Sequence, residues 1–89
     1  MDIEYTVQIW KEGSQFVAHA MPLDVMSSGK TPAEAGEALD EAVRLFLATA
    51  AEMGTFEEIL QECGYELRDG QWTCPPSIAV ERHSAAVGV

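Results

Sequence analysis

Two histidines and two cysteines are the side chains of this chain that could ligate a soft metal ion. Structural zinc sites use close pairs such as Cys-x2-Cys, whereas Cys63 and Cys74 are far apart in the sequence and His19 and His83 stand alone. We therefore expect no metal site and no cofactor. The two cysteines are too few for a disulfide framework. They fall on either side of a predicted hairpin, which leaves open whether they meet in space.

A second group of residues that could take part in catalysis consists of His19, Asp24 and the adjacent serines Ser27 and Ser28. A hydrolytic triad can be drawn from these residue types. One large class of such hydrolases places its nucleophile in a Gly-x-Ser-x-Gly elbow, and the chain contains no such elbow. The serines are better explained as partners of backbone groups at a turn and a strand end. We therefore expect that the protein is not an enzyme.

Four carboxylates crowd one predicted helix: Glu34, Glu37, Asp40 and Glu41. Residues three or four apart are neighbours on a helix surface. This acidic face is either solvated, with Arg44 relieving part of the repulsion, or presented to a basic partner. Cation binding is a weaker interpretation, because helical spacing does not surround an ion with oxygen ligands.

Trp10 falls on the polar phase of the first predicted strand. A large aromatic side chain on a wet face is typical of an interface, although packing beneath a C-terminal segment of the same chain explains it equally well. The residues that we predict to bind a partner are Trp10, Glu37, Asp40 and Glu41.

The charge of the chain restricts the classes of partner. The net charge is −10, and phosphate binding needs clustered lysines and arginines. We therefore expect no direct binding of nucleic acid and rapid association with basic proteins, with an acidic surface that serves solubility as the alternative. No apolar run is long enough to cross a membrane, and the acidic N-terminus differs from a secretory signal. We expect a cytoplasmic protein.

Hydrophobic periodicity predicts an α+β fold. Residues 3–21 alternate with period two around a Gly-Ser turn and predict an antiparallel hairpin, and residues 25–28 predict a short third strand. A helix is predicted from Pro32 to residue 53, with Thr31 as its N-cap and Glu34 at the capping-box position. The inward phases predict a shared core of Ile3, Tyr5, Val7, Ile9, Leu39, Val43 and Phe46.

The remainder of the chain predicts smaller elements. Thr55 to Glu58 repeats the capping-box pattern and predicts a short second helix, and Asp69-Gly70 predicts a two-residue hairpin turn. Residues 77–89 predict an extended C-terminal strand. A domain of this size buries a modest share of its surface, and the apolar side of helix 32–53 is wide. We therefore expect a homodimer or a larger homo-oligomer.

A series of short motifs runs through residues 3–50. They are Tyr5 to Ile9, Phe16 to Ala18, Pro22 to Val25, Ser28 to Ala35 and, in the helix, Leu39, Ala42, Val43 and Leu45 to Leu47. In this order they resemble the HicB-like antitoxin family. The resemblance implies a three- to four-stranded antiparallel sheet with a long helix on one face, a partial ribonuclease-H-type fold. Residues 1–54 would form the HicB-like core and residues 55–89 a further part of the same domain.

Members of that family neutralise small basic ribonucleases of HicA type by covering the active site. The resemblance therefore implies a non-enzymatic antitoxin that binds a HicA-like ribonuclease. Many members also carry a C-terminal DNA-binding domain, for which residues 55–89 offer no two-helix unit, so we expect a stand-alone member. The first alternative is an orphan HicB-like homo-oligomer with a regulatory role. The second alternative, from a different class, is a small hydrolase or nuclease.

Overall fold

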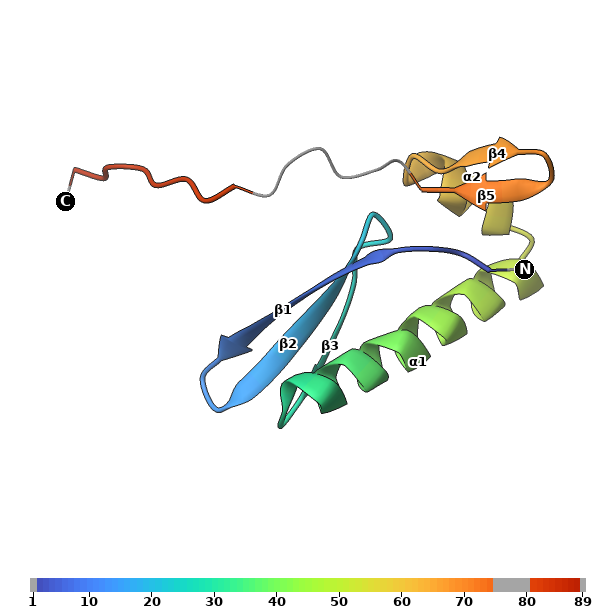
Figure 1. The fold of residues 1–89 in the computed structure, drawn as a ribbon. Coiled ribbons are helices and arrows are strands. Elements are labelled where there is room, and N and C mark those ends of the chain that lie inside the picture. Colours follow the sequence, from blue (N-terminus) through green and yellow to red (C-terminus); the bar gives the residue numbers. More distant parts are fainter. Residues whose placement is uncertain (1, 75–80, 89) are drawn as a thin grey trace.

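A three-stranded antiparallel sheet, one long helix, a short helix and a two-stranded hairpin make up the computed structural model, which describes residues 2–74 and 81–88 (Figure 1). This confirms the predicted α+β class. The elements are β1 (Thr6–Glu12), β2 (Gln15–Met21), β3 (Val25–Gly29), α1 (Pro32–Glu52), α2 (Phe56–Glu62), β4 (Glu66–Arg68) and β5 (Gln71–Thr73). Residues 81–88 contain no strand, so the predicted C-terminal strand is wrong there; residues 75–80 and 89 lie outside the described residues.

The main sheet has the order β1-β2-β3, with β2 in the middle. Its register pairs Val7 with Ala20 and Ile9 with Ala18, so these four side chains share one face. Ala18 and Ala20 are fully buried, which identifies this face as the one that α1 covers. Gly13 makes the β1–β2 turn with a positive φ of 64°, a conformation that glycine adopts without steric cost.

The N-terminus of α1 is held by the predicted capping residues. The Thr31 hydroxyl accepts a hydrogen bond from the Glu34 N–H at 3.1 Å, and the Glu34 carboxylate accepts one from the Lys30 N–H at 3.0 Å. The carboxylate thus reaches one residue further back than in a standard capping box. A Cβ at Gly29 would lie 2.6 Å from the Ala35 backbone nitrogen, so only glycine allows β3 to pass this close to the helix.

The second predicted capping box is wrong. The Thr55 side chain makes no cap hydrogen bond to α2; its hydroxyl donates instead to the Ala50 carbonyl at 3.4 Å. Thr55 therefore satisfies a carbonyl in the last turn of α1, because Gly54, with a φ of +74°, folds the chain back over that helix end.

The core differs from the predicted set at three positions. Leu39 and Val43 are buried as predicted, and Ile3 and Tyr5 are half-buried against them. Val7, Ile9 and Phe46, however, are 39%, 40% and 36% exposed. The strands have the predicted phase, but α1 contacts β2 and β3 far more than β1, so it leaves the inward side chains of the edge strand uncovered. The C-terminal half of α1 runs away from the sheet (Figure 1). Phe46 belongs to this half of the helix by its position in the sequence.

The elements α2, β4 and β5 pack at the C-terminal end of α1 (Figure 1). Leu60, Tyr65 and Trp72 are buried in the same cluster as Leu39. The Tyr65 hydroxyl donates a hydrogen bond to the Glu4 carbonyl, which ties this part to the segment before β1. The cluster therefore extends the core beyond the sheet.

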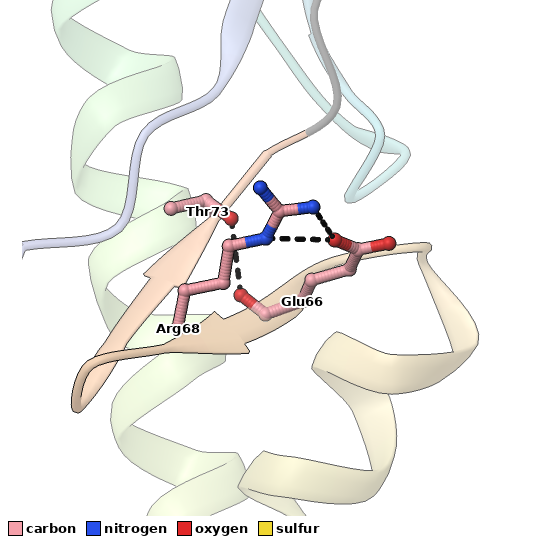
Figure 2. A network of polar contacts seen from close by, with 3 residues as sticks. All are labelled: Glu66, Arg68 and Thr73. Atoms are coloured by element: carbon pink, nitrogen blue, oxygen red, sulfur yellow. Dashed lines mark hydrogen bonds and ion pairs between the residues drawn. The ribbon is translucent and has the colours of Figure 1, made fainter.

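The β4–β5 hairpin has the predicted two-residue turn, in which Asp69 and Gly70 have positive φ angles of 51° and 76°. Figure 2 shows its polar side: Arg68 donates through Nε and Nη2 to one Glu66 carboxylate oxygen at 3.1 and 2.6 Å, and Thr73 donates to the Glu66 carbonyl at 3.2 Å. These side chains are exposed, so the ion pair contributes about 1 kcal/mol or less to stability.

Candidate protein-binding surface

The side of α1 that faces β1 carries one of the predicted partner-binding carboxylates and borders the other two. Helical spacing places Gly36, Asp40 and Leu47 along this side, with Glu37 and Glu41 next to it toward solvent. A Cβ at Gly36 would meet the Ile9 side chain at 3.8 Å. We call the exposed carboxylates Glu37, Asp40 and Glu41 the acidic flank, and it lies beside the uncovered inner face of β1.

The carboxylates of Glu37 and Glu41 make no hydrogen bond or ion pair with any other residue in the described ranges. The same holds for the Arg44 guanidinium, although Arg44 is four residues from Asp40. The acidic flank therefore keeps two carboxylates available to a partner. Like charges this close slightly destabilise a helix, which a cationic partner would relieve.

Asp40 is held by a contact that the sequence reasoning missed: the Tyr5 hydroxyl donates a hydrogen bond to its Oδ1 atom. Burial, the hydrogen bond to Asp40 and the negative charge of Asp40 raise the pKa of Tyr5 to about 12, while the positive charge of Arg44 lowers it. The phenol therefore stays protonated and remains a donor at neutral pH. The hydroxyl of a half-buried tyrosine usually finds such a partner, and this is the signal that could have linked the segment before β1 to the helix.

A pocket of about 420 Å³ opens beside this hydrogen bond, and we call it the N-terminal pocket. Ile3, Val43, Leu47 and Phe56 form its apolar walls, and Asp2, Tyr5, Asp40 and Arg44 contribute polar groups. The walls come from the segment before β1, from α1 and from the first residue of α2. No local sequence pattern predicts it, because its walls meet only through the tertiary packing.

Trp10 lies on the opposite face of the sheet from the acidic flank. It pairs with Val17, one register position away from the inward pair of Ile9 and Ala18, so its side chain is on the face away from α1. There its ring meets the His19 ring edge-on, with centroids 6.4 Å apart and planes at 78°. The structure thus brings Glu37, Asp40 and Glu41 together and separates Trp10 from them by the sheet.

The histidine on that outer face is engaged by an acid. His19 Nε2 lies 2.6 Å from Asp24 Oδ1, and Asp24 has a positive φ of 60°. Ser28 pairs with Val17 on the same face, while Ser27 pairs with Ala18 and so lies toward α1. His19, Asp24 and Ser28 thus lie on the outer face and only Ser27 lies on the other face. Within the described residues neither serine hydroxyl makes a hydrogen bond to His19.

The two cysteines are thiols, partly buried against the cluster that contains Leu60, Tyr65 and Trp72. Cys63 follows α2 as its C-cap, and Cys74 follows β5. Burial raises the pKa of the Cys63 thiol, and the charges of Glu62 and Asp24 raise it further. Burial and both neighbouring thiols also raise the pKa of Tyr65, so Cys63 and Cys74 gather around this one phenol. Within residues 2–74 and 81–88 no cluster of three or more His, Cys, Asp or Glu residues is placed to hold a metal ion.

Comparison of the chain with protein families, with curated proteins and with solved structures finds no match. Among the described residues no helix combines the length and the apolar character needed to cross a membrane. The surface features that could bind a partner are the acidic flank, the uncovered face of β1 and the N-terminal pocket.

Proposed function

We propose that the protein is a non-enzymatic antitoxin that binds and neutralises a small basic ribonuclease of HicA type. The binding surface would be the acidic flank of α1 together with the uncovered inner face of β1. The observation that carries this proposal is that exposed Ile9 lies against Gly36, the residue before the unpaired Glu37, while exposed Val7 is on the same face of β1. Apolar side chains bordered by charged groups are typical of protein interfaces.

Charge supports a basic protein as the partner. The chain carries a net charge of −10, and complementary charge raises the rate at which two proteins meet. Exposed ion pairs add about 1 kcal/mol or less each to affinity, so the acidic flank would act mainly on association. The resemblance of residues 3–50 to HicB-like antitoxins supports a HicA-type ribonuclease as the particular basic partner.

The test is the association kinetics of the protein with a small basic ribonuclease of HicA type, taken from a neighbouring gene where one is found, at several salt concentrations. Reversing Glu37 and Glu41 to lysine should slow association at low salt and flatten its salt dependence. The matched control reverses Glu58 and Glu62, an exposed pair with the same spacing on α2. Equal effects from the two double variants would show that only net charge matters and would remove the acidic flank from the interface.

The functional readout is cleavage of RNA by the same ribonuclease. Wild-type protein should stop cleavage at a one-to-one ratio, whereas the Glu37→Lys/Glu41→Lys variant should need a higher concentration at low salt. Uninhibited cleavage in the presence of excess wild-type protein would refute the antitoxin proposal.

Self-association is favoured by a separate observation. Leu45 of α1 and Met53, the C-cap residue that follows α1, are 59% and 71% exposed. Helical spacing places Leu45 one turn after Glu41, at the solvent-facing border of the acidic flank. An orphan homo-oligomer is therefore the second candidate function. It would be preferred if the protein forms stable oligomers and binds no basic protein encoded next to it.

A further inference from the structure

We propose that the N-terminal pocket receives a lysine or arginine side chain of the protein partner, with the aliphatic part against its apolar walls and the charged group at Asp40. The inference rests on the proposed function, because it assigns the anchoring contact of the same interface. The acidic flank would then bring the partner to the surface, and the pocket would hold it there.

The walls of the pocket suit the stem of a long basic side chain. Val43 is buried, and Ile3, Leu47 and Phe56 are half-buried around the opening. Lysine and arginine carry three or four methylene groups that pack on apolar surface while the charged end stays at a polar group. The volume of about 420 Å³ falls within the range of about 300–1,000 Å³ that is typical of ligand pockets.

The polar end of the pocket is prepared to accept hydrogen bonds from a cation. Asp40 Oδ1 already accepts the hydrogen bond from the Tyr5 hydroxyl, which restrains the carboxylate without consuming its acceptor capacity. An ionised carboxylate has about four lone-pair sites, so Oδ2 remains for a partner. Asp2 adds a second carboxylate to the lining.

Arg44 is the feature that argues for an anion as the occupant, because this residue lines the same pocket and its guanidinium has no ion-pair partner in the described residues. Two carboxylates outnumber this one cation, and the net charge of −10 favours the approach of basic groups. The long Arg44 side chain is exposed and is free to turn toward Glu37 or Glu41 when a cation enters. A cation is therefore the better occupant, and an anion is the competing outcome of the test.

The first experiment uses small probes on the full chain. Nα-acetyl-arginine amide, its uncharged norleucine analogue and pentanoate are titrated separately, and amide chemical shifts are followed by NMR. The arginine probe should shift residues 3–5 and 40–47 with a dissociation constant in the millimolar range, and the norleucine analogue should bind less tightly. Asp40→Asn, which keeps the acceptor for Tyr5, should weaken the arginine probe about three- to tenfold.

The matched control is Asp69→Asn in the β4–β5 turn, which removes the same charge at a site with a positive φ that asparagine tolerates. It should leave binding of the arginine probe unchanged. Stronger binding of pentanoate than of the arginine probe would overturn the inference and assign the pocket to an anion. Equal loss of binding in the Asp40 and Asp69 variants would also overturn it, because attraction would then be a property of the whole chain.

The second experiment separates this inference from the proposed function. Asp40→Asn and Leu47→Ala are tested for dissociation from the neighbouring ribonuclease, and both should speed it about tenfold, with Asp69→Asn as the control. A ribonuclease that binds all three variants equally well would overturn the pocket inference while the antitoxin proposal stands. An arginine probe that binds in the pocket while no ribonuclease binds the protein would refute the antitoxin proposal and support a cation pocket.

Discussion

Replacing Leu39 by alanine should cost far more stability than the same replacement at Leu45, which lies two turns away on the same helix. Leu39 is fully buried and Leu45 is 59% exposed. Removing three buried carbons at about 0.8 kcal/mol each costs about 2.4 kcal/mol, and the residual cavity brings the usual range to about 2–5 kcal/mol. At Leu45 the buried share is less than half and no cavity forms, so we expect about 1 kcal/mol or less.

The assay is urea denaturation followed by circular dichroism and by the fluorescence of buried Trp72, at one protein concentration for all variants. A domain of this size has a total stability on the order of 5–15 kcal/mol, so Leu39→Ala should shift the midpoint strongly with an unchanged slope. Similar midpoints for the two variants would refute the placement of α1 on the sheet. A larger effect at Leu45 would mean that another chain buries it.

Three further predictions concern the close approach at Gly29, the pKa of Tyr5 and the oligomeric state. Gly29→Ala should destabilise the fold by roughly 1–3 kcal/mol, because its Cβ would lie 2.6 Å from the Ala35 nitrogen, whereas Gly88→Ala, with nothing within 4 Å, should be neutral in the same urea assay. The pKa of Tyr5 is raised from 10 to about 12, so the contribution of Tyr5 to stability is complete below pH 10 and is lost as the pH rises to 12. Tyr5→Phe should therefore flatten the fall in stability between pH 10 and 12. An identical fall in both proteins would refute the raised pKa of Tyr5. Light scattering at tens of micromolar protein should give the mass of a dimer or larger, and a monomer mass would count against self-association.

The first helix start was predictable because its chemistry is local. Thr31 and Glu34 can satisfy orphan N–H groups within four residues of themselves, and the structure places them there. The same pattern at Thr55 failed, because Thr55 has φ −108° and ψ 6° instead of the extended backbone of an N-cap, and its hydroxyl donates to the Ala50 carbonyl after the chain reverses at Gly54. This backbone conformation depends on tertiary packing, which the local sequence pattern does not show.

The phase of each strand was predictable, but the amount of burial was not. Alternation correctly placed Val7 and Ile9 on the face that α1 covers, opposite Ala20 and Ala18. Their exposure depends on which strands the helix crosses, and that is fixed by packing against β2 and β3. Phe46 likewise sits in the apolar stripe of a helix that is longer than the sheet beneath it.

The candidate surface was predictable in part. Helical spacing was enough to group Glu37, Asp40 and Glu41, and alternation was enough to place Trp10 on the opposite face of β1 from Val7 and Ile9. The bond between Tyr5 and Asp40 joins residues 35 positions apart, and the N-terminal pocket joins three separate segments. Such long-range contacts leave no periodic signal in the chain.

The most direct test of the proposed interface is an amide hydrogen-exchange footprint of the protein with and without a small basic ribonuclease of HicA type. We expect protection in residues 36–47 of α1 and at Tyr5, Val7 and Ile9, with no change in the β4–β5 hairpin. Protection confined to the Trp10 and His19 face of the sheet, or no protection at saturating ribonuclease, would contradict the proposal.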